Sequence, residues 1–265
     1  MKSNWRAVDP SELWLRRHLV WMLTVRDIKA RYKQSVLGVM WAVVRPLMLM
    51  IVFSYLFGSV ANLPNNGLPY PVFVFAALIA WDLFANIVQG CANSITSHKA
   101  VVEKLYCPRL LFPISAVLAA LFDFVIAFSV FCMLLLAFGI PPSGNIIWLP
   151  LMVLGVVFAG LSVGLWLAAI AVWLRDVKYA VSYMLQLMLL LTPIGYGATA
   201  VPEKFAFIVV WNPMASLVET FRWSLLGTVS PSLHIGLISF GVISILLIGG
   251  VLFFNSLERS FADVI

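Results

Sequence analysis

Long apolar segments alternate with short polar connections along almost the whole chain. A helix needs about 20 apolar residues to cross the ~30 Å hydrocarbon core of a bilayer, because each residue rises 1.5 Å. Six segments qualify by length and composition: Leu37–Phe57, Val72–Gln89, Leu110–Phe138, Ile146–Trp173, Tyr179–Tyr196 and Ile235–Phe254. The pattern therefore predicts an all-α integral membrane protein with six transmembrane helices.

A seventh apolar segment, Phe205–Leu226, is interrupted. Asn212 and Pro213 break it, since proline has no backbone N–H, and Glu219 and Arg222 place charges in its second half. Apolar pieces this short are typical of re-entrant or interfacial helices. Broken backbone is tolerated at membrane depth only where protein or a wet cavity surrounds it. We therefore expect a re-entrant helix pair between the fifth and sixth spans.

The N-terminal segment has the pattern of an amphipathic helix and not of a span. One face collects residues spaced four and three apart: Trp14, His18, Trp21, Val25, Ile28 and Tyr32. Basic residues dominate the remaining surface: Arg16, Arg17, Arg26, Lys29, Arg31 and Lys33. The pattern favours a helix at the membrane interface, with its aromatic side at the headgroups and its basic side toward anionic lipid. The alternative is a topology anchor with no further role.

The composition excludes several other classes of protein. Residues of the set AVILMFWYC make up 63% of the 265 positions, against ~45–50% in soluble domains, and only 11% are charged. Neither a soluble globule of this length nor a disordered chain fits these values. The cysteines are three in number and form no CxxC motif, so we interpret Cys91, Cys107 and Cys132 as small apolar residues and not as disulfides or zinc ligands.

The distribution of basic residues predicts the orientation, because loops rich in Lys and Arg stay in the cytoplasm. Fourteen of the 17 lie in the N-terminal segment, two alternate loops and the tail, whereas the opposite loops hold only Lys204 and Arg222. No run resembling a cleavable signal peptide precedes the first span. We expect both termini in the cytoplasm, which requires an even number of crossings.

Three charged residues lie inside the predicted spans, where each is costly and marks an ion pair or a pathway. Arg45, Asp82 and Asp123 all lie close to the expected midplane. One interpretation is an internal ion pair of Arg45 with Asp82 or Asp123. The other is that Arg45 binds an anionic head group, since its planar guanidinium suits phosphate.

Aromatic residues offer a second candidate for the substrate path. Phe124, Phe128 and Phe131 follow one face of the third span, and their rings could stack on the C–H faces of sugars. Ordinary helix packing or lipid contact is the alternative interpretation for each of them.

Signals for catalysis are weak. His18, His98 and His234 lie on three separate connections and cannot form a joint base or metal site. The chain has no GxxxxGK[ST] loop. We expect a protein that is not an enzyme, with no catalytic residues, no metal and no nucleic-acid partner.

The connection between Asn93 and Arg109 predicts a short charged helix. It carries the residues that would face a soluble partner: His98, Lys99, Glu103 and Lys104. A solvated connection is the alternative.

Two sets of motifs resemble a known family. The first set surrounds the start of the first span: Arg26-Asp27, Arg31-Tyr32-Lys33, Ser35-Val36-Leu37-Gly38, Trp41 and Arg45-Pro46-Leu47. The second lies toward the other end of the chain: Thr192-Pro193-Ile194, Val201-Pro202, Trp211-Asn212-Pro213, Glu219 and Arg222. In order and spacing they are similar to the ABC-2-type permeases that export polysaccharides, and among these to the O-antigen exporter permeases.

The resemblance implies a half-transporter that works as a homodimer with two separate ATP-binding subunits, which would hold ATP and Mg, so that this chain has no cofactor of its own. Ser97–Tyr106 would be the coupling helix on the ATPase, and Ala200–Gly227 the re-entrant pair. The implied division is residues 1–35 for the cytoplasmic amphipathic helix, 36–257 for the transmembrane domain and 258–265 for the cytoplasmic tail.

The implied substrate is a lipid-pyrophosphate-linked glycan, with O-antigen as the first candidate, and membrane lipid is a further expected partner. Capsular polysaccharide or teichoic acid would use the same mechanism. An integral-membrane lipid-processing enzyme is the alternative outside the transporter class.

Overall fold

The computed structural model describes residues 14–33, 38–61, 67–104, 107–174, 176–197, 201, 204, 206–230 and 232–258, and every regular element in these ranges is helical. The elements follow in this order: α2 (Arg17–Tyr32), η1 (Gly38–Met40), α3 (Trp41–Phe53), η2 (Ser54–Val60), α4 (Tyr70–Ser97), α5 (Lys99–Lys104), α6 (Leu111–Ala137), η3 (Gly144–Trp148), α7 (Leu149–Trp173), α8 (Val177–Leu191), α9 (Ala206–Trp211), α10 (Pro213–Leu226) and α11 (Leu233–Leu257). Most of the predicted N-terminal segment is thus described, whereas the tail beyond Glu258 lies outside these ranges.

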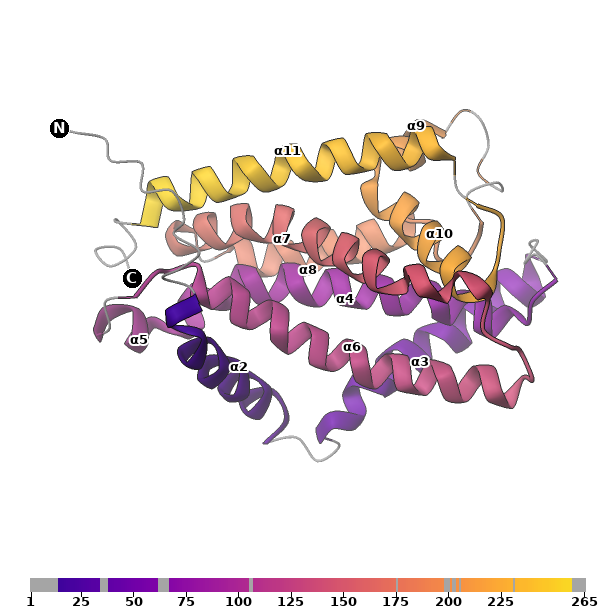
Figure 1. The fold of residues 1–265 in the computed structure, drawn as a ribbon, viewed down its shortest axis with the longest axis horizontal. Helices are drawn as coiled ribbons and strands as arrows, with labels where there is room; N and C mark the ends of the chain where they lie inside the picture. The colour runs from indigo at the N-terminus through magenta and orange to yellow at the C-terminus, as the bar shows by residue number, and fades with distance from the viewer. Residues whose placement is uncertain are drawn as a thin grey trace.

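The long helices run side by side, with α2 and α5 at one end of the molecule and η3 and α9 at the other (Figure 1). Helix α4 is the central element, and 89% of its most apolar stretch is buried within the chain. Helices α6 and α7 pack closely on it. On α7, Gly160 and Gly164 allow this approach, because a Cβ atom at either position would lie 2.7 Å from the side chain of Ile87 or Cys91.

Five helical stretches in the described residues are long and apolar enough to cross a membrane: Gly38–Val60, Tyr70–Ser97, Leu111–Ala137, Gly144–Trp173 and Leu233–Leu257. They overlap five of the six predicted spans. The first stretch combines η1, α3 and the π-helical η2, and only 17% of its apolar window is buried within the chain. Most of its surface is therefore left for lipid or for another protein.

The fifth predicted span, Tyr179–Tyr196, is shorter than expected. Helix α8 covers Val177–Leu191, 15 residues, and then ends. The cause is Pro193, because the residue before a proline avoids the helical region, and Thr192 has the extended angles φ −87° and ψ 137°. The chain from Thr192 to Tyr196 continues as a series of bends.

The interrupted segment is broken where the sequence predicts. Helix α9 ends at Trp211 and α10 begins at Pro213. Between them, Asn212 accepts a hydrogen bond from the backbone N–H of Met214 at 3.1 Å, which caps α10. Helix α10 ends at Gly227, whose positive φ of 66° suits glycine. It packs against α4, α7 and α11, so the second half of this segment is part of the protein interior.

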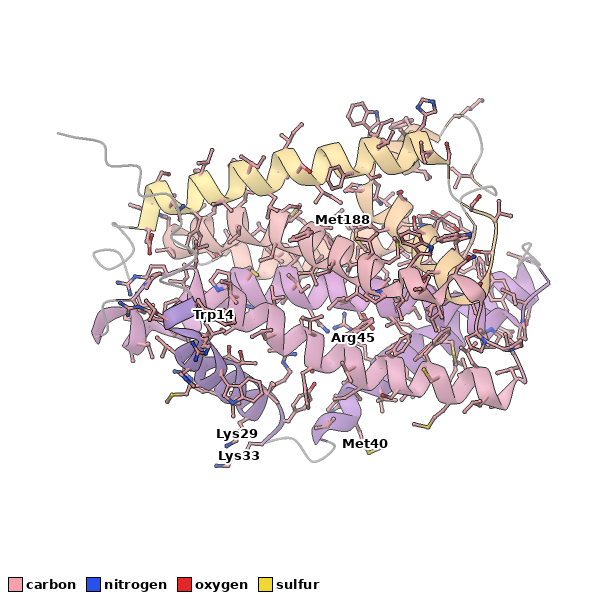
Figure 2. All side chains as sticks on the ribbon, in the orientation of Figure 1. Trp14, Lys29, Lys33, Met40, Arg45 and Met188 are labelled. Carbon is pink, nitrogen blue, oxygen red and sulfur yellow. The ribbon has the colours of Figure 1, made fainter. Side chains whose placement is uncertain are left out.

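Helix α2 lies against α6 at the same end of the molecule as α5 (Figure 1). Its face toward the protein consists of Val20, Leu23 and Thr24. Trp14 and Trp21 are 71% and 65% exposed, which leaves the indole rings available to an interface. Lys29 and Lys33 point away from the other helices (Figure 2).

Candidate functional site

The three charged residues predicted inside the spans line one cavity. It has a volume of about 330 Å³ and lies between α2, α3, α4 and α6. Arg45 comes from α3, Asp82 from α4 and Asp123 from α6, while Arg31 and Tyr32 of α2 complete the charged wall. Arg45 lies in the middle of the molecule (Figure 2). The sequence predicted that these three residues lie close to the midplane of the membrane, and the fold places all three on the wall of the same cavity.

Asp123 is paired with α2 and not with Arg45. Its carboxylate accepts hydrogen bonds from the Arg31 guanidinium and from the Tyr32 hydroxyl. Burial raises the pKa of Tyr32 to about 12, and the hydrogen bond to Asp123 and the carboxylate charge act in the same direction. The hydroxyl therefore stays protonated at physiological pH and remains a donor to Asp123.

Arg45 has a different environment. Within the described ranges it makes no ion pair at 4.0 Å or less. Its side chain is exposed and borders the cavity. A guanidinium offers five donors in a planar fork that matches phosphate oxygens. The chemistry available at this position is thus recognition of an anion.

The three predicted phenylalanines of α6 begin at the cavity and end in the hydrophobic core. Phe124 lines the cavity and stacks on Phe128, with ring centroids 5.7 Å apart. Phe131, one turn further, is fully buried and stacks on Phe75 of α4 at 6.2 Å. Of the three phenylalanines predicted to contact sugars, Phe124 therefore lines the cavity, whereas Phe131 is part of the hydrophobic core.

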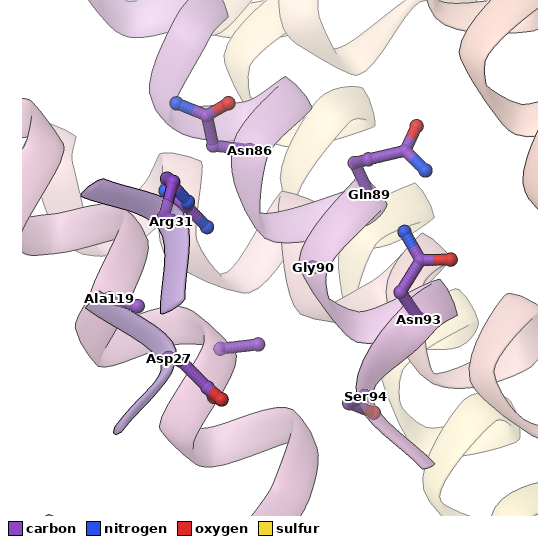
Figure 3. A pocket seen from close by; sticks show the side chains of 9 residues that line it. Asp27, Arg31, Asn86, Gln89, Gly90, Asn93, Ser94 and Ala119 are labelled. Atoms are coloured by element: carbon purple, nitrogen blue, oxygen red, sulfur yellow. The ribbon is translucent and has the colours of Figure 1, made fainter. Parts of the chain in front are cut away.

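A polar cavity that the sequence interpretation missed lies beside the first. It has a volume of about 270 Å³, and α4 lines it with three side-chain amides, Asn86, Gln89 and Asn93 (Figure 3). Asp27 and Arg31 of α2 line the cavity as well. Arg31 and Asn86 border both cavities, so the two spaces adjoin.

A sequence signal for this second cavity exists. Asp82, Asn86, Gln89 and Asn93 are spaced four, three and four apart, which places them on one face of a helix. The predicted span Val72–Gln89 ended inside this row. Asn93 was therefore assigned to the following connection and separated from the other three, so the row was not recognised.

His98 lies at the start of the predicted coupling segment but faces inward. It is 2% exposed, and its Nε2 atom lies 3.0 Å from Oδ1 of Asp27 on α2. This approach lacks the alignment of a hydrogen bond, since no hydrogen-bond partner of Nε2 occurs among the described residues. The ring also packs 5.2 Å from that of Phe112. His98 is thus placed to contact α2, and it is too buried to touch a soluble partner directly.

The other residues of the coupling segment divide into two groups. Lys99 begins α5 and is exposed. Glu103 and Lys104 are in the same helix, but their side chains lie outside the described part of the chain.

Arg222 on α10 holds the unwound chain that follows α8. The guanidinium is fully buried and donates to the carbonyls of Phe73 at 3.2 Å, Pro193 at 3.0 Å and Ile194. It also pairs with Glu219 at 3.1 Å. Carbonyls freed by the end of a helix need donors at membrane depth. Arg222 supplies these donors, which explains the charge in an otherwise apolar segment.

Asn212 adds a contact between the same two regions. Its side-chain amide donates to the hydroxyl of Thr192 at 3.0 Å. The break between α9 and α10 is thereby tied to the end of α8. The four residues predicted for this region, Asn212, Pro213, Glu219 and Arg222, thus all lie at the break or in α10.

The comparisons with known proteins agree with one another. The sequence model of the ABC-2 type transporter family matches residues 18–226. An O-antigen export system permease protein of Klebsiella pneumoniae is 30% identical over 250 residues, which cover 93% of this chain and 95% of that protein. The corresponding protein of Myxococcus xanthus is 32% identical over 80% of this chain and 81% of its own length. A polysialic acid transport protein of Escherichia coli is 21% identical over 87% of this chain and 90% of its own. The chain therefore belongs to the ABC-2 type transporter family.

Proposed function

We propose that this chain is the membrane permease subunit of an exporter that moves a lipid-pyrophosphate-linked polysaccharide across the bacterial inner membrane. The observation that carries the proposal is the match over 93% of the chain to a permease of O-antigen export. Export permeases for O-antigen are 28–32% identical to the chain, whereas those for polysialic acid are 21–22% identical. O-antigen is therefore the first candidate, and a capsular polysaccharide is the second.

The substrate would meet the charged cavity first through its head group. Arg45 is the cation that borders the cavity without an ion partner among the described residues, and a pyrophosphate would supply that partner. Asp123 is already occupied by Arg31 and Tyr32 and would shape the wall. The ring of Phe124 could then contact the first sugar.

Energy would come from two separate ATP-binding subunits that dock at α5. Helix α2 could transmit a movement from that docking point to the cavity, because it contacts both. At one end Asp27 contacts His98, next to α5, and Arg26 donates to the carbonyl of Ser97 at 3.1 Å. One turn later Arg31 reaches Asp123 on the cavity wall. A shift of α5 would therefore displace α2 and change the cavity.

Six crossings and a re-entrant pair fit this function. Helix α8 alone rises about 22 Å at 1.5 Å per residue, which is short of the ~30 Å core. The bent chain from Thr192 to Tyr196 could complete the crossing, because Arg222 satisfies its carbonyls. Helices α9 and α10 would then enter and leave from one side, and both termini would stay in the cytoplasm of a homodimeric permease.

The test is polymer export in the native cell. Deletion of the gene should leave finished glycan on the inner face of the membrane, and reintroduction should restore glycan outside, in an ATP-dependent manner. Glycan that is missing or chemically altered in the deletion strain would instead favour the lipid-processing enzyme. Cysteine labelling along 206–226 from outside only would support the re-entrant pair.

A further inference from the structure

We propose that Asn86, Gln89 and Asn93, here called the amide row, form a binding site for the uncharged sugar units next to the lipid head group. This inference rests on the proposed function, since it assigns the sugar-binding part of the same substrate path. The observation behind it is the second cavity, which adjoins the charged one.

The two ends of the amide row lie in different surroundings. From Asp82 to Asn93 the row extends over 11 helical steps of 1.5 Å, which is roughly 16 Å along the axis of α4. The charged cavity with Arg45 lies at the Asp82 end. The other end lies at Asn93, close to the end of α4. A ligand with an anionic group at one end and neutral polar groups along its length matches this order.

The amides are not used to join helices, with one exception. Gln89 accepts a hydrogen bond from the hydroxyl of Ser182 on α8 at 3.0 Å. For the side chains of Asn86 and Asn93, no hydrogen bond occurs within the part of the chain that the structure describes. Polar groups in a spanning helix are costly and mark a pathway or an interhelical contact. Two amides without such a contact, both lining one cavity, indicate a ligand (Figure 3).

The chemistry of the row suits sugar hydroxyls. Each side-chain amide offers an oxygen acceptor and two N–H donors, and each hydroxyl can donate and accept. Neutral amides make these bonds without fixing a charge in the span. Across the cavity, the Asp27 carboxylate adds an acceptor and the Arg31 guanidinium adds donors. Such a set recognises a polyhydroxylated ring, whereas a bare isoprenoid pyrophosphate would leave the amides unused.

The experiment compares two probes on the full chain in lipid nanodiscs with its ATPase subunits and without nucleotide. One probe is farnesyl pyrophosphate, and the other is the same lipid carrying N-acetylglucosamine. Asn86→Ala with Asn93→Ala should bind the sugar-bearing lipid about tenfold more weakly and the bare lipid unchanged, as expected for the loss of one or two hydrogen bonds. The matched control is Asn145→Ala, an amide of η3 at the opposite end of the molecule.

The outcomes separate this inference from the proposed function. Sugar binding by the amide row is refuted if the wild type binds the two probes with equal affinity. It is also refuted if the affinity of the double variant is unchanged for both probes or lowered equally for both. Binding of the lipid itself stands in each of these cases. Failure of the wild type to bind either probe would refute both proposals. If the double variant does not fold, Asn93→Ala alone is measured against the same criteria, with an expected loss of about threefold.

Discussion

The imidazole of His98 lies 3.0 Å from the carboxylate of Asp27, and this contact joins the segment before α5 to helix α2. His98 is buried, and Asp27, which is partly exposed, also accepts a hydrogen bond from Ser115 on α6. Helix α2 is therefore held between the predicted docking helix and the cavity wall. This arrangement makes the role of α2 in coupling testable.

Asp27→Asn should reduce export several-fold while the ATPase subunits still co-purify and still hydrolyse ATP. The amide keeps the shape but removes the charge that faces His98. Rates of ATP hydrolysis and of export, measured on the same preparation, give the ratio of the two. Lys29→Gln is the control, because Lys29 is exposed on the same helix and points away from the bundle. An unchanged ratio for Asp27→Asn would remove α2 from the coupling route.

Arg45→Lys should lower export about tenfold without a change in the amount of folded protein. Lysine keeps the charge but loses the planar fork, and one well-placed charged hydrogen bond contributes about 1.5–3 kcal/mol. Folding should be unaffected, because within the described ranges Arg45 makes no ion pair.

Export is measured as polymer outside the cell, and folded protein by size-exclusion chromatography. Arg17→Lys, the same change at an exposed position of α2, should be silent. Equal loss of export and of folded Arg45→Lys protein would indicate a structural role instead.

Arg222→Leu should lose most folded protein. The side chain is buried, donates to four backbone carbonyls and pairs with Glu219, so its removal takes the donor away from each of these contacts. Breaking such a buried arrangement costs about 3–5 kcal/mol. Arg222→Lys should not recover it, because one ammonium group cannot reach the same set of acceptors.

The yield of monodisperse protein and its Tm in detergent give the readout for Arg222. Thr220→Ala is the control, because its hydroxyl bonds only to the Ser216 carbonyl of its own helix among the described contacts. Wild-type stability of Arg222→Leu would contradict the anchoring role.

The sequence predicted most of the helical framework because apolar length alone identifies a span. It missed the shortening of α8, since apolar residues continue past Thr192 and only the proline rule marks the end. It also missed the partners of Asp123. Arg31 and Tyr32 were assigned to a helix on the membrane surface, and the packing of α2 on α6 is a tertiary contact that no local pattern encodes.

The burial of His98 is a second feature that depends on tertiary contacts and could not be predicted from the local sequence. His98 was predicted to face a soluble partner together with Lys99, Glu103 and Lys104, but the fold buries it against Phe112 and Asp27. The interpretation of Arg222 was closer to the outcome. Its charge marked the interrupted segment as unusual, and the carbonyls that it serves became visible only with the end of α8 in place.

Gly160→Ala should destabilise the protein by about 1–3 kcal/mol, although alanine is the better helix former. The new Cβ atom would lie 2.7 Å from Cγ2 and 2.8 Å from Cβ of Ile87, which is branched and fixed in the core of α4. Helices α4 and α7 would have to move apart, as in other overpacked cores.

Gly241→Ala is the matched control for this packing contact, because Gly241 lies inside α11 with nothing within 4 Å of the added Cβ atom. It should be neutral or stabilising by up to about 1 kcal/mol through the helix preference of alanine alone. The two variants are compared by Tm in the same detergent. Shifts of the same sign and size would mean that the close contact of α7 with α4 does not limit stability, whereas opposite signs would locate the central packing of the permease at this glycine.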